Sequence, residues 1–172
     1  MENKLNEILQ TKRLTLQPVQ NTDLKALKEV INVHEVFATI INSTLKFTQN
    51  SFANIQNLLN FEIIEKNGEI IIGFCGLFFF NTTGANCYYY LSPQYRGNGY
   101  AIEAMKKVLE FAFMKLRLSN INSYIHSENQ NAWKVAERIG MMYMGDLVNE
   151  TTNRKIMVFL IEKPDFVNQG FY

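Results

Sequence analysis

The sequence has little of what marks secreted, metal-binding or membrane-spanning chains. Its only two cysteines, Cys75 and Cys87, lie in apolar strand-like runs without CxxC spacing, which indicates buried free thiols and a reducing, cytoplasmic compartment. Its two histidines, His34 and His126, stand apart from any cysteine or second histidine, so we expect no metal site. Residues 1–10 are polar, unlike a signal peptide, and no window approaches the ~18 apolar residues of a membrane span.

An excess of charge of either sign is also missing. The chain has 17 basic and 16 acidic residues and a net charge of +1, which gives no support for a general nucleic-acid or membrane surface. What it does have is 47% hydrophobic residues over a length of 172, enough for a sizeable core. No linker, repeat or low-complexity tract divides it. We therefore expect a single domain over 1–172, with a loose arm at 1–11 and a tail at 163–172.

Hydrophobic spacing predicts strands and helices in alternation. Helical spacing and capping residues predict helices at 21–31, 33–41, 51–59, 100–117 and 129–140, the last closed by Gly140. Alternating or continuous apolar runs predict strands at 13–17, 61–65, 69–80, 85–91, 121–127, 141–147 and 155–161. This order predicts an α/β fold layered around a mixed sheet.

Two finer details follow from local residue types. Asn67 and Gly68 both tolerate positive φ, so they predict a tight hairpin between the strands at 61–65 and 69–80. Glu103 and Lys107 are four residues apart, which predicts an ion pair on the outer side of the helix at 100–117.

A glycine-rich turn, RGNGYA at 96–101, separates the strand at 85–91 from that helix. Glycines two apart leave backbone N–H groups uncovered beside the positive end of a helix, a geometry that binds phosphate oxygens. A dinucleotide fingerprint needs a third small residue where Ile102 stands, and a P-loop needs Gly-Lys-Ser or Gly-Lys-Thr. The pyrophosphate loop of acyl-CoA-dependent transferases and an ordinary strand-to-helix turn stay open.

Around this turn the chain resembles the GNAT superfamily of N-acetyltransferases. The family signature, Arg or Gln, two residues, Gly, one residue, then Gly or Ala, is met by Arg96, Gly99 and Ala101. The segments TKRLTLQPV, YYYLSPQYRGNGYAIEAMKKVLEFAF and HSENQNAWKVAERIGM are similar to the Rim-type branch, the ribosomal-protein alanine N-acetyltransferase-like enzymes. The resemblance implies a mixed, mostly antiparallel central sheet with helices on both faces. It also implies acetyl-CoA as cosubstrate, without a metal.

The resemblance further implies which residues hold acetyl-CoA. Backbone groups of one strand would face the pantetheine arm, the loop N–H groups would face the pyrophosphate, and Asn129 would contact the CoA arm. Together these are Tyr89, Tyr90, Leu91, Arg96, Gly97, Asn98, Gly99, Tyr100, Ala101, Ile102 and Asn129. Alternatives stay open for several of them. Arg96 can be a solvated surface charge, the tyrosines plain sheet packing, and Asn129 only a helix N-cap.

The acid and base of the family are not found at their usual positions. The positions that carry them in relatives are occupied here by Asn86, Tyr124, Ala132 and Ala136. No catalytic side chain can therefore be assigned. One explanation is catalysis by positioning, with water taking the proton, which favours an α-amine or another amine of low pKa. The alternatives are a non-catalytic acyl-CoA sensor or interaction module, and a structural protein that does not bind CoA.

The acceptor is not readable from the sequence. The pocket for it is expected from residues 33–60 and 149–154, which carry no specificity code. Peptide N-termini, polyamines, antibiotics and sugar amines all stay open as acceptors. The protein is expected to act as a monomer or a homodimer.

Overall fold

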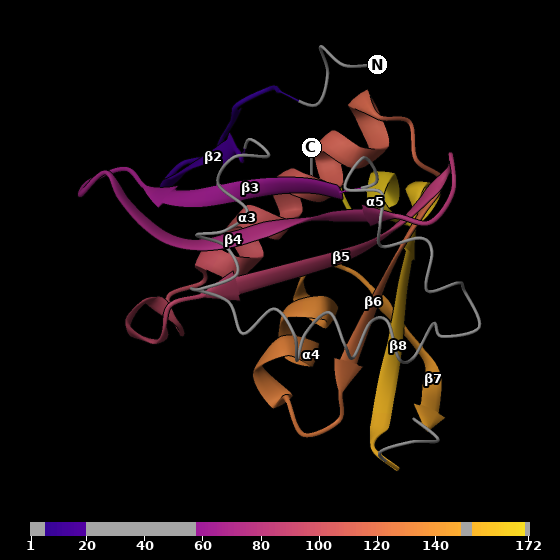
Figure 1. Ribbon diagram of the computed structural model, residues 1–172. Helices are drawn as coiled ribbons and strands as arrows, with labels where there is room; N and C mark the ends of the chain where they lie inside the picture. Colours follow the sequence, from indigo (N-terminus) through magenta and orange to yellow (C-terminus); the bar gives the residue numbers. More distant parts are fainter. Residues whose placement is uncertain (1–5, 20–57, 149–152, 171–172) are drawn as a thin grey trace.

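The computed structural model of the chain describes residues 6–19, 58–148 and 153–170, which build an eight-stranded sheet (Figure 1). Its order is β1-β2-β3-β4-β5-β6-β8-β7. The strands are Leu9–Gln10 (β1), Leu14–Pro18 (β2), Leu58–Glu65 (β3), Ile70–Phe79 (β4), Gly84–Leu91 (β5), Asn120–His126 (β6), Met142–Val148 (β7) and Lys155–Glu162 (β8). Only β5 and β6, of these described neighbours, run parallel. The predicted mixed, mostly antiparallel sheet is confirmed.

Three described α-helices pack with this sheet: α3 (Tyr100–Glu110), α4 (Gln130–Arg138) and α5 (Lys163–Asn168). The apolar stripe of α3 is buried as its spacing predicts, through Ala101, Ala104, Met105, Val108 and Leu109. α3 runs along the back of β3, β4 and β5 in Figure 1 and joins one core with them. The helices predicted at 21–31 and 33–41 lie outside the described residues, as does 51–57 of the third.

The helix predicted over 100–117 is wrong in its last turns. α3 ends at Glu110, and Phe111–Lys115 form a wider π-helical turn in which Leu116 N–H donates to Phe111 O at 3.1 Å. Phe111, Ala112 and Phe113 are all buried in this turn. Three consecutive residues of an α-helix spread over more than half of its circumference. The wider turn thus accompanies a run of buried side chains that a helical period does not predict.

The junction of β3 and β4 also differs from expectation. Leu58 and Leu59, assigned by their spacing to a helix, belong to β3, because pairing with β4 continues over the whole strand. The hairpin itself is confirmed, but the expected positive φ at Asn67 and Gly68 is wrong. Positive φ occurs at Glu69 instead, with a value of 50°.

The described parts of the predicted arm and tail contain secondary structure. Within the predicted arm, Leu9 is buried in β1, which pairs with β2. Within the predicted tail, α5 carries Phe166, which is fully buried and lies 5.3 Å from Phe113 between ring centroids. These apolar contacts are long-range, and so the polar composition of each terminus did not reveal them.

The predicted pair of Glu103 and Lys107 is wrong as well. Lys107 Nζ bonds Glu110 Oε2 at 2.9 Å, three residues along the same helix. Glu103 bonds instead to Thr11 and Arg13 of the N-terminal segment. An exposed pair four residues apart on a helix is worth only about 0.3–0.5 kcal/mol, so tertiary partners readily replace it.

The end of α4 confirms the predicted role of Gly140. Gly140 has φ 91°, its N–H donates to Glu137 O at 2.9 Å, and Met141 N–H donates to Ala136 O at 3.0 Å. This pair of bonds is a Schellman motif, which requires a left-handed residue. Met141, the residue after Gly140, is buried directly before β7 begins at Met142.

Replacing Gly140 by alanine is expected to lower the free energy of unfolding by about 1–2 kcal/mol, because an L side chain is strained at positive φ. The new Cβ would also overlap the Gln169 side-chain amide. Thermal unfolding should show a Tm lower by roughly 2–8 °C. Gly140→Asn is the control, since asparagine tolerates this conformation and should lose less. Equal losses for both variants would contradict the role of φ.

Candidate functional site

β5 and β6 stay together only where both strands begin. Their paired residues are Gly84, Ala85 and Asn86 on β5 and Asn120, Ile121 and Asn122 on β6. Beyond these pairs the two strands diverge, β5 towards Leu91 and β6 towards His126 (Figure 1). A separation inside a sheet leaves backbone groups on both strands without a neighbouring strand. The fold therefore opens a wedge in its own sheet, with its apex at Asn86.

The hydrogen-bond alternation of β5 shows which backbone groups face this wedge. Ser92 N–H donates to Ile72 O of β4 at 2.9 Å. In an antiparallel ladder every second residue bonds to the same neighbour, so Tyr90 also bonds to β4. The N–H and C=O groups of Tyr89 and Leu91 therefore point the other way, into the wedge. Of the three predicted strand residues, two offer backbone groups there, and Tyr90 offers its side chain.

A cavity of about 740 Å³ occupies the wedge and extends over the glycine-rich loop and α4. Every predicted CoA-binding residue except Asn98 lines it. The lining residues are Cys87, Tyr88, Tyr89, Tyr90, Leu91, Arg96, Gly97, Gly99, Tyr100, Ala101, Ile102, Ser123, Tyr124, Ile125, His126, Asn129, Asn131, Ala132, Lys134, Val135, Arg138 and Arg154. Segments more than 60 residues apart in sequence thus form one wall.

The loop between β5 and α3 has the conformation that phosphate binding needs. Gly97 and Gly99 have φ of 81° and 77°, in the left-handed region that glycine adopts without strain. Within the part of the chain that the structure describes, the N–H groups of residues 97–102 donate to no acceptor. No side chain caps α3, so its first N–H groups and the positive end of its dipole stay open to the cavity.

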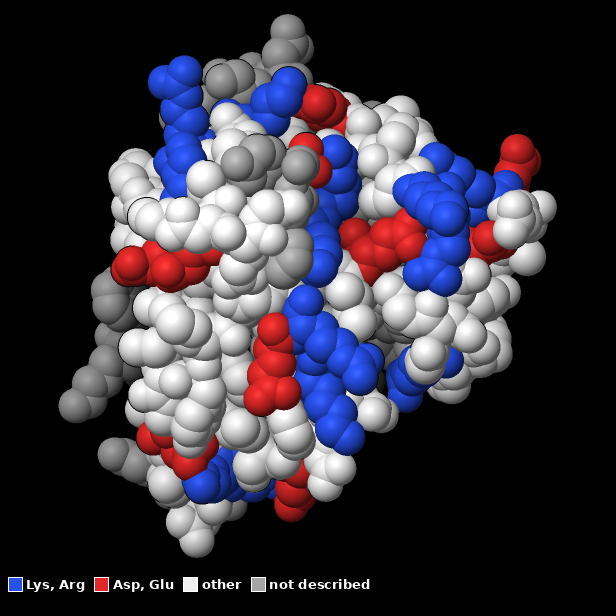
Figure 2. Space-filling view, turned by 180° about the vertical axis from the view of Figure 1, so that it is seen from behind, with Lys and Arg blue, Asp and Glu red and all other residues white. Residues whose placement is uncertain are grey.

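Charge around the cavity is of one sign. The described residues that line it include Arg96, Lys134, Arg138 and Arg154, and no aspartate or glutamate. Figure 2 shows a band of Lys and Arg side chains down the middle of the face that carries α3. Arg96 is not a freely solvated charge, because its Nε donates to Leu91 O at 2.9 Å and its guanidinium lies over the Tyr90 ring. Open N–H donors and nearby cations fit the phosphate groups of CoA.

Two predicted residues have local roles. Asn98 does not line the cavity, and its side-chain amide donates to Tyr95 O at 3.4 Å and Arg96 O at 3.3 Å. Asn129 does line it, and its Oδ1 also accepts the Ala132 N–H at 3.2 Å, which makes it the N-cap of α4. The N-cap bond therefore exists, and it does not remove Asn129 from the cavity wall.

Only two of the four positions expected for an acid or a base line the cavity. Tyr124 and Ala132 line the cavity, whereas Ala136 and Asn86 are buried beside it with exposed fractions of 3% each. Asn86 Oδ1 has no hydrogen-bond partner among the described residues, although it lies at the apex of the wedge. Burial raises the pKa of Tyr124, so its phenol is neutral near pH 7. None of these four side chains is a base at that pH.

Sequence reasoning did not assign Cys87 and His126 to the site, because no local motif marks these two residues of the cavity wall. Arg154, which belongs to the segment 149–154 expected at the acceptor pocket, does line the cavity. Burial raises the pKa of Cys87 to about 12, so its thiol is not a nucleophile at neutral pH. Only the β5–β6 divergence brings Cys87 and His126 to one cavity, and that divergence is a tertiary feature.

Among residues 6–19, 58–148 and 153–170, no group of three or more His, Cys, Asp or Glu side chains is placed to hold a metal ion. None of the helices described is both long and apolar enough to cross a membrane.

Comparison with known proteins agrees with this geometry. The sequence model of the acetyltransferase (GNAT) domain matches residues 13–142. The uncharacterized N-acetyltransferase YnaD of Bacillus subtilis is 28% identical over 144 residues, covering 78% of this chain and 82% of YnaD. A spermidine N-acetyltransferase from Vibrio cholerae, solved with CoA and spermine, has a TM-score of 0.73 at 20% identity over 92% of this chain and all of that one.

A GNAT-family acetyltransferase structure from Bacillus anthracis gives a TM-score of 0.70 at 22% identity, covering 92% of this chain and 99% of that one. These solved structures share the fold. The domain match covers most of the chain and spans the glycine-rich loop and the wedge. The chain therefore belongs to the GNAT family of acetyltransferases.

Proposed function

We propose that the protein transfers an acetyl group from acetyl-CoA to the primary amine of a small molecule, by direct attack in a ternary complex. The observation that carries this proposal is the wedge between β5 and β6, with open backbone donors at its wide end and only basic charged residues on its described walls. Acetyl-CoA, when bound, supplies the activated thioester. All the remaining work falls to binding, orientation and proton removal by this chain.

Each part of the site has a proposed task. The N–H groups of residues 97–102 would hold the pyrophosphate, with Arg96, Lys134 and Arg138 close to the anionic groups. The backbone N–H and C=O of Tyr89 and the N–H of Leu91, whose C=O already accepts from Arg96, would bond the pantetheine arm, as a strand bonds its neighbour. A backbone N–H of β5 would stabilise the negative charge that develops on the acetyl oxygen. Asn129 would contact the arm while capping α4.

The chemical step needs little from side chains. The amine nitrogen bonds to the acetyl carbon while the carbon–sulfur bond breaks, and the amine loses a proton that water carries away. Holding both reactants in place can supply roughly 7–11 kcal/mol in favourable cases. Asn86 Oδ1, buried at the apex of the wedge and not on the cavity wall, accepts hydrogen bonds but not protons, so it does not supply the missing base.

The acceptor we propose first is a polyamine-like small molecule. The relatives include spermidine N(1)-acetyltransferase of Escherichia coli, 30% identical over 60 residues, which cover 35% of this chain and 32% of that protein. The Rim-type resemblance gives the second candidate, a protein N-terminal α-amine. Of the segments expected to form the acceptor pocket, 33–60 and 149–154, residues 33–57 and 149–152 lie outside the described residues. The test below therefore includes both kinds of amine.

A non-catalytic acyl-CoA-binding module is the alternative from another class. It is favoured by one observation: Asn86, Tyr124, Ala132 and Ala136 provide no base near neutral pH. We propose a reducing, cytoplasmic setting, because Cys75 and Cys87 are free and buried. This setting does not distinguish the two functions. We further propose that residues 1–172 form a single domain, a monomer or homodimer that binds neither nucleic acid nor membrane.

The deciding experiment measures CoA release from acetyl-CoA against spermidine, spermine, amino sugars and peptides with free N-termini. Release that depends on an added amine, with the acetylated product detected by mass spectrometry, is the expected result. Calorimetry with CoA accompanies the screen. Tight CoA binding without release against the whole panel would support the binding module, and absence of binding would contradict both functions.

A further inference from the structure

The first turn of α3 carries an acidic side chain directly after the phosphate-binding loop. Glu103 follows the residues whose N–H groups are open, and its own N–H donates to Gly99 O at 3.1 Å. A carboxylate in the first turn stabilises a helix. The same negative charge would repel a phosphate that approaches these N–H groups. A site for an anionic cofactor therefore needs a means of cancelling the charge of Glu103.

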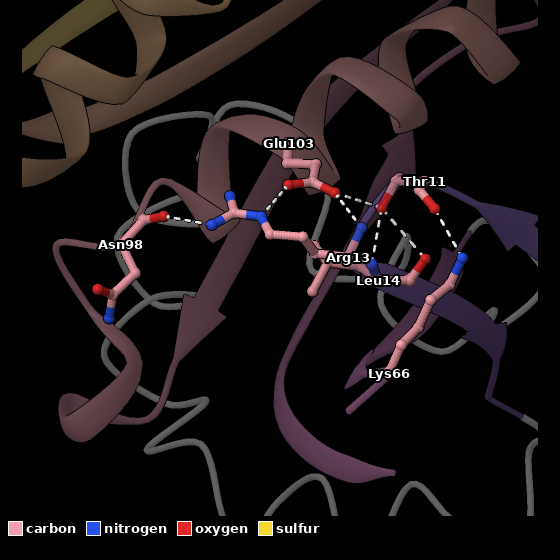
Figure 3. A network of polar contacts seen from close by, with 6 residues as sticks. All are labelled: Thr11, Arg13, Leu14, Lys66, Asn98 and Glu103. Atoms are coloured by element: carbon pink, nitrogen blue, oxygen red, sulfur yellow. Dashed lines mark hydrogen bonds and ion pairs between the residues drawn. The ribbon is translucent and has the colours of Figure 1, made fainter. Parts of the chain in front are cut away.

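Arg13 provides that means from the turn before β2 (Figure 3). Its Nε donates to Glu103 Oε2 at 2.6 Å, and its backbone N–H donates to Oε1 at 2.7 Å. The Thr11 hydroxyl donates to the same Oε1 at 2.6 Å. Burial raises the pKa of Glu103, but these bonds and the Arg13 charge outweigh it and lower the pKa. The Glu103 carboxylate is therefore ionised, its charge is balanced by Arg13, and it is held on the side of the N-terminal segment.

Arg13 also holds the loop itself. Its NH1 donates to Asn98 O at 2.9 Å, and its guanidinium carbon lies 4.4 Å from the centre of the Tyr100 ring. Its NH2 lies 3.5 Å from where a Cβ of Gly99 would be. One side chain thus contacts the loop before α3, the first residue of α3 and its acidic residue. Arg13 itself does not line the cavity, so its contacts leave the cavity face of the loop open.

We propose that Arg13 is a positioning residue for the phosphates of CoA: it neutralises Glu103 and fixes the Asn98–Gly99 backbone so that the N–H groups of residues 97–102 can bind the pyrophosphate. This inference rests on the proposed function and deepens it. The N-terminal segment, more than 80 residues before the loop, is then part of the cofactor site.

The test compares Arg13→Gln with two acetyl donors. S-acetylpantetheine has the thioester and the arm of acetyl-CoA but lacks the pyrophosphate and the nucleotide. Arg13→Gln should raise the KM for acetyl-CoA about tenfold, with kcat within about twofold, because a helix-end charge interaction changes binding by that order. Its kcat/KM with S-acetylpantetheine should stay within about twofold of wild type. Lys12→Gln is the matched control, because it removes one positive charge from the exposed neighbour of Arg13. This substitution should change the kinetic constants for neither donor.

A double variant separates the effect of the Glu103 charge from a structural effect of losing Arg13. Glu103→Gln added to Arg13→Gln should recover part of the lost acetyl-CoA affinity, because the uncompensated carboxylate is then gone. A purely structural role predicts equal losses with both donors and no recovery in the double variant, and that result would overturn the proposal. So would an Arg13→Gln KM equal to that of wild type, or a Lys12→Gln loss of the same size.

Failure of the proposed function has a different signature. A wild-type protein that binds CoA without releasing it from acetyl-CoA contradicts acetyl transfer. The Arg13→Gln variant is then compared with wild type by its dissociation constants for CoA and pantetheine. The constant for CoA should rise about tenfold, and the constant for pantetheine should stay unchanged. A wild-type protein that does not bind CoA overturns both.

Discussion

Replacing Gly99 by tryptophan is expected to raise the dissociation constant for CoA at least about 100-fold. Gly99 lines the cavity at the point where the loop enters α3, and its φ of 77° turns the following N–H groups outward. A side chain there starts 3.5 Å from Arg13 NH2, so an indole would displace Arg13 from the loop and disturb the backbone that presents these donors. A charge-assisted hydrogen bond is worth about 1.5–3 kcal/mol, so the loss of even two of them is enough for this effect. Isothermal titration with CoA measures it directly.

Backbone strain has to be separated from the effect of the indole in that experiment. Gly170 also has positive φ, 66°, and open space where its Cβ would be, and it does not line the cavity. Gly170→Trp should therefore carry a comparable strain, about 1–2 kcal/mol, and keep the CoA affinity of wild type. If Gly99→Trp remains folded and binds CoA as tightly as wild type, the loop is not the phosphate site.

The parts of the site that sequence predicted are those where a residue type has a local conformational reason. Gly97, Gly99 and Gly140 all have positive φ, and Asn129 caps the helix it precedes. The glycines are needed by the conformation of their own backbone, and Asn129 by the N–H group three residues along that its side chain accepts. The neighbouring sequence then suffices, because no distant partner decides the outcome.

The parts that sequence did not predict depend on partners that are far apart in the chain. Glu103 was placed with Lys107 because they are close in sequence, but its partners are Thr11 and Arg13. Leu58 and Leu59 fit a helical spacing, yet pairing with β4 places them in a strand. The Rim-type resemblance stays a prediction, because the comparisons show the GNAT family and not this branch.

The geometry of β5 shows how structure sharpens an expectation from resemblance. Tyr89, Tyr90 and Leu91 were all expected to expose backbone groups. The register with β4 engages the backbone of Tyr90 and leaves Tyr89 and Leu91 directed into the wedge. Alternation along a strand is a simple rule, but it needs the register, and the register depends on the neighbouring strand.

The rate of acetyl transfer is expected to follow the protonation of the acceptor amine rather than of the enzyme. Burial raises the pKa values of Cys87 and Tyr89 to about 12 and raises that of Tyr124, so these cavity groups are protonated at neutral pH and accept no proton. We therefore expect the amine to lose its proton to water before it attacks. Only its neutral fraction reacts, and below the amine pKa this fraction rises about tenfold per pH unit.

Two acceptors of different pKa turn this into a measurement of kcat/KM between pH 6 and 10. For an amine with a pKa near 10.4, kcat/KM should rise about 100-fold from pH 7 to 9, whereas for an α-amine of pKa about 7.7–8.0 it should level off by about pH 9. A plateau at one shared pH for both acceptors would contradict the prediction and indicate a base in the protein. His126 is the imidazole on the cavity wall, so His126→Gln would then show whether that base is the histidine, by removing the shared plateau.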